Sequence, residues 1–197
     1  MTDKQKLIIS SVDNALTFTD KYLQGFLDAV YKIPDYMVDS SKQISSLDWC
    51  FWKPMKANID ASEFEEYEKR TGTQLPESYI MFLSYKHFID LNFGHDVIFF
   101  KHTKNWIPDN IETISRWGIE TTLQKKLLPF ADISDVGLVC FDAREPERDN
   151  EYNIVYIDHH DREYPQKFQH AHFSFIDLIK EMNNVLDKWR VAKINGN

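Results

Sequence analysis

The chain contains little cysteine and no long hydrophobic run. Its 197 residues include two cysteines, Cys50 and Cys140, which form no Cys-x-x-Cys pair and indicate a reducing compartment. Cys140 lies in the apolar run GLVCF, where we interpret it as a small buried hydrophobe rather than a reactive thiol. The longest apolar run, Tyr79 to Leu83, has five residues, whereas a membrane-spanning helix needs about 20. We therefore expect a soluble, cytoplasmic protein without a membrane segment.

Glycine is also scarce, and the motifs of common enzyme classes are missing. The six glycines never approach the GxGxxG or P-loop spacing that cradles phosphates. No Gly-x-Ser-x-Gly elbow or cysteine signature places a nucleophile beside a base. Acidic pairs such as Asp132 with Asp135 occur, but carboxylates at this density are more typical of a solvated face than of catalytic acids. We therefore predict that the protein is not an enzyme and binds no cofactor.

Four of the seven histidines lie close together in the sequence and leave two interpretations open. They are His159, His160, His170 and His172. His170 and His172 would point to the same side of an extended backbone, as the ligands of a metal site would. The usual ligand spacings, such as His-Glu-x-x-His, are absent, which favours surface histidines near the end of a strand. We predict no metal.

The residues that are present favour a packed core with an N-terminal extension. Hydrophobic residues make up 43% of the chain and aromatic residues 14%, which argues against disorder. Over residues 1–33, apolar side chains recur at alternating steps of four and three, which predicts one long helix ended by Pro34. Its stripe is wider than a coiled-coil seam and favours packing on its own domain over a dimer or a partner-binding helix. Residues 35–48 indicate a connection or a short irregular helix.

Two capped helices are predicted between Ser62 and Leu83. Ser62 followed by Glu65 is a capping-box pattern at a helix start. Gly72 suits the left-handed turn after that helix, and Pro76 suits the first turn of the next one. The second helix has an apolar stripe made of Tyr79, Phe82 and Leu83.

Short strands are predicted after this helix pair. Runs of β-forming residues at 97–100, 138–141 and 154–157 are too short for helices. Helical spacing predicts one helix that begins near Pro108 and another from Ser174 to about Arg190. Helices first, strands in the middle and a helix at the end predict an α+β domain.

Several motifs occur in an order that is similar to that of a known family. Trp52 and Pro54 precede the first helix, Glu65 and Glu68 lie on it, and LPESYIMFL follows. The later motifs are LLPFAD (127–132), GLVCFD (137–142), IVYIDHH (154–160) and FSFIDLIKEM (173–182). Over roughly residues 50–190, this ordered set resembles the SUKH superfamily, which includes fungal cell-wall-assembly regulators and bacterial toxin-immunity proteins. The resemblance implies a mostly antiparallel central sheet flanked by helices.

The resemblance suggests how the chain is divided. We expect an N-terminal helical extension at 1–48, a SUKH-like domain at 49–192 and a tail at 193–197. The aromatic cluster of Trp49, Phe51 and Trp52 precedes the first helix of this domain, where such clusters usually serve packing.

Acidic residues are concentrated in one stretch of the chain. The sequence carries 31 acidic and 23 basic residues, a formal net charge of −8. Between residues 142 and 161, seven acidic residues are balanced only by Arg144 and Arg148, which leaves five surplus negative charges. Such a field is unsuited to nucleic-acid phosphates and suits a basic protein. The alternative is that these carboxylates only keep the protein soluble.

The predicted partner-binding residues combine carboxylates with aromatic anchors in loop-like segments. They are Trp106, Asp132, Asp135, Glu145, Glu147, Asp149, Glu151, Tyr152 and Tyr164. From resemblance and charge, we expect an immunity protein, monomeric or weakly dimeric, that occludes the active site of a basic, nuclease-type toxin. The alternative is a regulatory or scaffold module that recruits a protein partner through its N-terminal helix.

Overall fold

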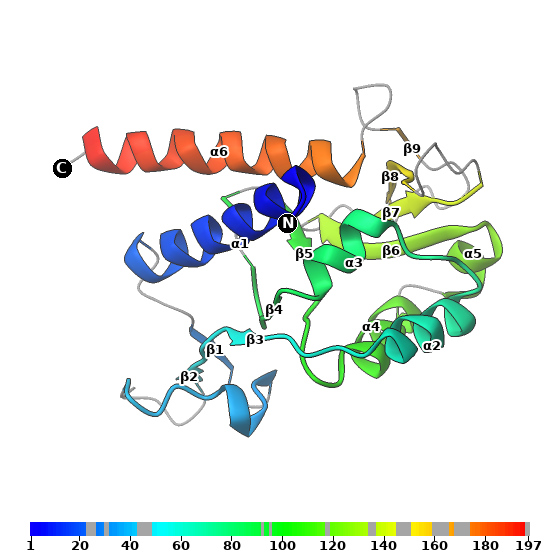
Figure 1. Ribbon diagram of the computed structural model, residues 1–197, viewed down its shortest axis with the longest axis horizontal. Coiled ribbons are helices and arrows are strands. Elements are labelled where there is room, and N and C mark those ends of the chain that lie inside the picture. The colour runs from blue at the N-terminus through cyan, green and yellow to red at the C-terminus, as the bar shows by residue number, and fades with distance from the viewer. Residues whose placement is uncertain are drawn as a thin grey trace.

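Two long helices, α1 (Asp3–Tyr22) and α6 (Phe175–Asn195), lie side by side along one side of the molecule, next to a five-stranded sheet (Figure 1). The structure is a computed structural model. The residues that it describes are 1–22, 27–29, 32–42, 49–91, 93–94, 96–116, 119–133, 137–144, 151–158, 166–167 and 174–195.

Shorter helices complete the helical part of the fold. They are the 3-10 helix η2 (Asp35–Met37) and the α-helices α2 (Ala61–Thr71), α3 (Glu77–Leu83), α4 (Trp106–Arg116) and α5 (Ile119–Gln124). In Figure 1, α3 lies near the start of α1, whereas α2, α4 and α5 lie together on the other side of the sheet.

The central sheet is antiparallel throughout and has the strand order β5-β6-β7-β8-β9. Its strands are β5 (Val97–Phe99), β6 (Leu127–Ile133), β7 (Gly137–Asp142), β8 (Asn153–Asp158) and β9 (Gln166–Lys167). Two small antiparallel pairs lie outside it, β1 (Leu27–Ala29) with β2 (Trp49–Phe51), and β3 (Met55–Lys56) with β4 (Lys86–His87). The predicted α+β class, with a mostly antiparallel sheet flanked by helices and an N-terminal helix, is confirmed.

Both faces of the central sheet are covered by other parts of the chain. Successive side chains of a strand point to opposite faces, so each strand contributes residues to two buried clusters. One face contributes Leu128, Phe130, Val139, Phe141 and Ile154 to the main core, which also contains residues of α1, α3 and α6. The other face contributes Leu127, Leu138, Cys140, Val155 and Ile157 to a second cluster with Ile114 of α4. Cys140 is therefore fully buried, as predicted.

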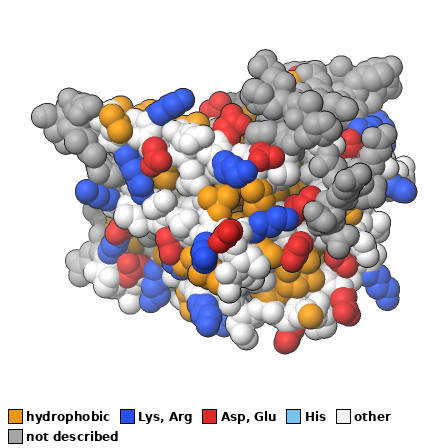
Figure 2. Space-filling view, turned by 45° about the horizontal axis from the view of Figure 1, so that its top comes forward, with side chains coloured by type: hydrophobic (Ala, Val, Ile, Leu, Met, Phe, Trp, Pro, Cys, Tyr) orange, Lys and Arg blue, Asp and Glu red, His pale blue; other side chains and the backbone are white. Residues whose placement is uncertain are grey.

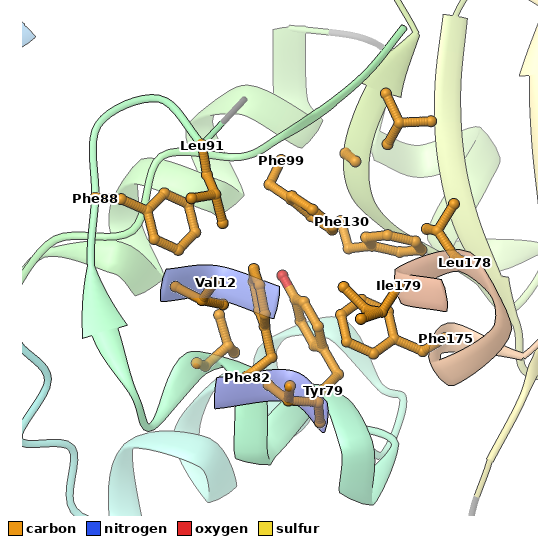
Figure 3. Packing of buried hydrophobic residues seen from close by; sticks show 14 of the residues in the cluster. Val12, Tyr79, Phe82, Phe88, Leu91, Phe99, Phe130, Phe175, Leu178 and Ile179 are labelled. Atoms are coloured by element: carbon orange, nitrogen blue, oxygen red, sulfur yellow. The ribbon is translucent and has the colours of Figure 1, made fainter. Parts of the chain in front are cut away.

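Aromatic rings from distant parts of the chain meet in the main core (Figure 3). The rings of Tyr79 and Phe175 lie 5.3 Å apart and those of Phe82 and Phe99 lie 4.8 Å apart, measured between centroids. Phe130 is also within 5.6 Å of Tyr79. The predicted stripe on α3 is confirmed, because Tyr79, Phe82 and Leu83 are all buried. Their contacts join α3 to α6 and to the sheet.

The N-terminal helix is shorter than predicted. It ends at Tyr22 rather than near Pro34, and β1 follows at Leu27–Ala29, paired in antiparallel register with β2. The prediction failed because helical periodicity does not detect a short strand whose partner residues lie at least twenty positions further along the chain. Pro34 instead precedes η2, which matches the expected short irregular helix.

Helix α2 begins two residues earlier than the sequence suggested. Its N-cap is Asp60, and the carboxylate of Glu63 accepts a hydrogen bond of 3.1 Å from the backbone amide of Asp60. The capping pattern Ser62 with Glu65 is thus displaced to Asp60 with Glu63. Gly72 ends the helix with φ 68°, in the left-handed conformation that was predicted, and Pro76 caps α3.

Three further differences concern element ends and one strand. Helix α4 begins at Trp106, so that Pro108 occupies its first turn instead of opening it. Trp49 lies on β2 with 47% of its surface exposed and is not a core residue, whereas Trp52 is buried as predicted. Helix α6 continues to Asn195, beyond its predicted end.

Candidate functional site

An apolar hollow lies between the start of α1 and the outer side of α3. It has a volume of about 380 Å³ and is lined by Met1, Gln5, Ile9, Ile80, Met81, Ser84 and Tyr85. We call it the α1–α3 hollow. Figure 2 shows one face of the molecule, on which hydrophobic side chains gather near the middle among acidic and basic ones.

The sequence of α3 explains why apolar side chains reach the surface here. Five consecutive apolar residues occupy positions 79–83, but a helix buries only one stripe of its surface. Tyr79, Phe82 and Leu83 take that stripe, so Ile80 and Met81 remain half-buried on the opposite side. Five consecutive apolar residues on one helix are therefore a sequence signal for apolar side chains at the surface, and this signal could have predicted the hollow.

A second, acidic hollow adjoins the first through Ile80. It has a volume of about 250 Å³ and is lined by Glu68, Gln74, Leu75, Glu77, Ile80 and Tyr152. The carboxylate of Glu68 accepts a hydrogen bond of 2.7 Å from the backbone amide of Leu75, which holds it in place. The lining contains two carboxylates and neither lysine nor arginine. We call it the acidic hollow.

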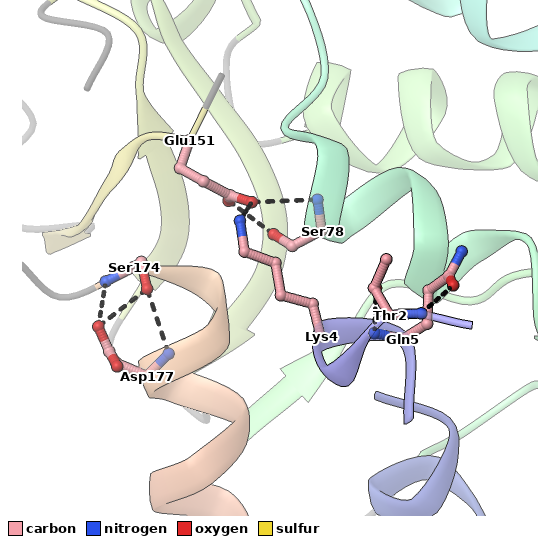
Figure 4. A network of polar contacts seen from close by, with 7 residues as sticks. All are labelled: Thr2, Lys4, Gln5, Ser78, Glu151, Ser174 and Asp177. Atoms are coloured by element: carbon pink, nitrogen blue, oxygen red, sulfur yellow. Dashed lines mark hydrogen bonds and ion pairs between the residues drawn. The ribbon is translucent and has the colours of Figure 1, made fainter. Parts of the chain in front are cut away.

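A buried carboxylate ties this surface together (Figure 4). Glu151 accepts hydrogen bonds from the hydroxyl of Ser78, at 2.6 Å, and from its backbone amide, at 3.2 Å. The ammonium group of Lys4 lies 3.5 Å from the same carboxylate. Glu151 is only 6% exposed. Its carboxylate therefore joins α1, α3 and the start of β8 and is not available to a partner.

The two long helices begin with reciprocal caps that the predictions missed (Figure 4). Thr2 and Gln5 exchange side-chain-to-backbone hydrogen bonds of 2.8 and 3.2 Å at the start of α1. Ser174 and Asp177 do the same at the start of α6, at 3.3 Å each. The spacings Thr-x-x-Gln and Ser-x-x-Asp are the signals that could have predicted both caps, although the start of the last helix at Ser174 was itself predicted.

Trp106 and Tyr152, predicted as aromatic anchors for a partner because they lie in loop-like segments or at element ends, are both buried. Trp106 is 0% exposed, its ring lies 4.9 Å from that of Tyr67, and its indole nitrogen donates to Glu63 at 3.2 Å. Tyr152 is 8% exposed and reaches the surface only at the acidic hollow. Both sit at element ends, as expected, but the surrounding helices cover them.

Asp132 lies half-buried on β6, where burial raises its pKa and the charge of Asp90 raises it further. The remaining predicted partner residues lie outside the described residues; they are Asp135, Glu145, Glu147, Asp149 and Tyr164. The same holds for His159, His160, His170 and His172. The structure therefore places Glu151 and Tyr152 beside the acidic hollow, Trp106 in the core and Asp132 on β6. The five residues outside the described part of the chain stay predictions.

Two other histidines, His87 and His102, form a buried pair that the sequence did not reveal. Their rings lie 4.8 Å apart, and 3% and 0% of their surfaces are exposed. The ring nitrogen Nδ1 of His102 lies 3.0 Å from the carbonyl oxygen of Lys86, whereas Nε2 of His102 and Nδ1 of His87 have no hydrogen-bond partner. Across the described part of the chain, no group of three or more histidine, cysteine or acidic side chains is arranged to hold a metal ion.

A third hollow, on α4, carries charges of both signs. Its volume is about 420 Å³, and Lys32, Lys101, Asp109, Glu112, Thr113 and Arg116 line it. Lys101 pairs with Asp109 at 3.0 Å and Arg116 with Glu112 at 2.5 Å. Because each of these carboxylates is paired with a cation, this hollow offers a ligand less net charge than the acidic hollow.

Fold and surface together define an α+β protein with adjoining apolar and acidic hollows. No helix among the described residues is both long enough and apolar enough to cross a membrane. The family model of SMI1 / KNR4 (SUKH-1) matches residues 58–177, and the chain belongs to this family. Proteins of this family are generally binding modules without catalytic activity. No curated protein matches the chain.

Proposed function

We propose that this chain is a non-catalytic immunity protein that neutralises a basic, nuclease-type toxin by occluding its active site. Family membership supports a role in binding another protein. The observation that carries the toxin proposal is the surplus of five negative charges over residues 142–161, in a chain of net charge −8. A nuclease cleft is basic because it must attract phosphates, so it also attracts a negatively charged protein of complementary shape.

The structure shows where two charges of this stretch are used. Arg144 forms hydrogen bonds of 2.7 and 2.6 Å with the carboxylate of Asp142, the last residue of β7. Glu151 is buried against Ser78 and Lys4. We therefore assign the steering of the partner to Glu145, Glu147 and Asp149, and we assign Glu151 to the fold.

Association kinetics test this assignment. The experiment takes as the partner a nuclease-like domain of a secreted protein, where one is encoded beside this chain, and mixes it with this chain by stopped flow at several salt concentrations. We expect the triple variant Glu145→Lys, Glu147→Lys and Asp149→Lys to associate at least about tenfold more slowly and with weaker salt dependence. The wild type should also inhibit the nuclease.

The matched control changes the net charge equally but elsewhere. Asp3→Lys, Glu65→Lys and Glu112→Lys reverse three exposed carboxylates on α1, α2 and α4. Local steering requires this variant to keep most of the rate. An equal loss in both variants, or no loss in the first, contradicts the assignment of the acidic stretch.

The alternative function is a regulatory module of the cell-wall-assembly type. Deletion of residues 1–33 would not separate the two functions, because Ile8, Val12 and Phe18 of α1 belong to the main core and their loss would unfold the domain. The genomic neighbourhood is the better test. A neighbouring gene for a large secreted toxin favours immunity, and an isolated gene favours regulation.

A further inference from the structure

The α1–α3 hollow and the acidic hollow form one continuous surface along α3. Ile80 lines both, with apolar side chains on one side and the carboxylates of Glu68 and Glu77 on the other. A segment that crosses Ile80 would therefore meet an apolar site and then a negatively charged one. We call this surface the α3 groove.

We propose that the α3 groove binds a segment of a protein partner that presents a large apolar side chain beside a lysine or arginine. The apolar side chain fills the α1–α3 hollow against Ile9, Ile80 and Met81. The cation enters the acidic hollow between Glu68 and Glu77. This inference rests on the proposed binding function and names the surface and the chemistry of the segment that it recognises.

Charge complementarity supports this occupant over others. The acidic hollow has two carboxylates and no basic residue in its lining, and the whole chain carries a net charge of −8. An acidic segment would be repelled, and a purely apolar one would leave the carboxylate of Glu68 covered and without a cation. A segment with a lysine or arginine avoids this repulsion and supplies a cation to the carboxylate of Glu68.

The surroundings of the groove hold these groups in place. Glu68 accepts the 2.7 Å hydrogen bond of Leu75, and the hydroxyl of Tyr85 donates to Asp13 at 2.7 Å. Asp13 also pairs with Lys86 at 2.7 Å, so the carboxylate that holds Tyr85 is balanced by a cation. Side chains that are already positioned lose less conformational entropy on binding.

A synthetic peptide provides the test, because no toxin is needed. The probe is a short amphipathic peptide of leucine and lysine, and its control has glutamate in place of lysine. NMR spectra of the full chain locate the peptide through backbone amide shifts. We expect shifts over residues 77–85 with the leucine–lysine peptide and much weaker ones with the leucine–glutamate peptide.

Variants divide the groove into its two parts. Met81→Asp should weaken binding about tenfold, because the apolar site loses its lining and gains a charge. Glu68→Gln with Glu77→Gln should weaken it about fourfold and reduce its salt dependence. Glu68→Gln keeps an oxygen that can accept from Leu75, so the loop stays in place.

Control variants distinguish binding in the α3 groove from non-specific binding of the peptide. Val191→Asp changes an apolar residue of α6 that is 57% exposed, and Glu65→Gln changes an exposed carboxylate of α2. Both should bind the peptide as the wild type does. Amide shifts centred elsewhere, equal binding of the glutamate peptide, or equal losses in the controls would overturn the proposal. Failure of the toxin experiment alone would leave the peptide result standing.

Discussion

At the scale of single residues, the buried histidine pair has the largest consequence for stability. His102 is fully buried, and burial lowers its pKa to about 3, with a further contribution from the charge of His87. The pKa of His87 is also lowered, by burial and then by Lys104, although Glu63 opposes this shift. Both imidazoles are therefore neutral in the native protein at pH 7.

This pair predicts that stability falls as the solution becomes mildly acidic. An unfolded histidine has a pKa of about 6.5. Below that pH the unfolded chain binds a proton at His102, whereas the native imidazole stays neutral, so the unfolded state is favoured. The free energy of unfolding should fall by about 1 kcal/mol between pH 7 and pH 5.5 through His102, and His87 should add a loss in the same direction. Urea denaturation at the two pH values measures this change.

The variant His102→Gln isolates the contribution of one ring. It should be less stable at pH 7, because Gln fills the site poorly, but it should lose about 1 kcal/mol less than the wild type on acidification. Carboxylates titrate in the variant and in the wild type alike, so their contribution cancels in this comparison. Identical losses in variant and wild type would show that His102 is already protonated or accessible.

At the scale of elements, Gly137 controls how closely β7 and β8 approach. A Cβ atom on Gly137 would lie 1.8 Å from the carbonyl oxygen of Ile157, which belongs to the backbone of β8. Gly137→Ala must therefore separate the two strands where they pair, and we expect a loss of about 3 kcal/mol or more. Urea denaturation gives the loss, and faster hydrogen exchange of β7 and β8 amides locates it.

Gly72→Ala is the matched control for that change. Gly72 has φ 68°, but a Cβ atom there would meet nothing within 4 Å. The cost is then confined to the left-handed backbone, about 1 kcal/mol. If both variants lose the same stability, the close approach of the strands is not what requires glycine at 137.

The elements also show which parts of the fold could be predicted from sequence. The end of α2 at Gly72, the strands at 97–100, 138–141 and 154–157, and the last helix follow from local patterns, and the structure contains them. The pair β1–β2 could not be predicted, because its partners are distant in sequence and neither run is long. Strand β6 contains Pro129, where the register with β7 shifts, so it lacks the regular alternation of a strand.

The candidate site was predictable only in part, for a related reason. A sequence shows that Trp106 and Tyr152 lie at element ends but not which helices cover them, and packing buries both. It shows a carboxylate at Glu151 but not that Ser78, seventy-three positions away, donates to it. The α3 groove depends on α1 lying against α3, which is a property of the packed molecule.

At the scale of the whole molecule, the predicted N-terminal extension contributes directly to the main core. Ile8, Val12 and Phe18 of α1 belong to the same buried cluster as Phe130 of the sheet and Phe175 of α6. Arg190 of α6 also donates to the carbonyl oxygen of Asn14 at 3.1 Å. The division at residues 48 and 49 stays a prediction, and the shared core argues that the two parts unfold together.

Cooperative unfolding tests this view with two probes. Far-UV circular dichroism is weighted toward the helices, including α1. Tryptophan fluorescence comes from five tryptophans and includes the exposure of Trp52 and Trp106, which are 1% and 0% exposed in the native protein. We expect one transition with coincident midpoints in urea. Ile8→Ala, at a buried position, should lower both midpoints together and cost about 2–5 kcal/mol, whereas Ile9→Ala, at the half-buried edge of the α1–α3 hollow, should cost less. A separate early transition in circular dichroism, shifted by Ile8→Ala while the fluorescence midpoint stays, would instead show that α1 unfolds independently and that the predicted extension is a unit of its own.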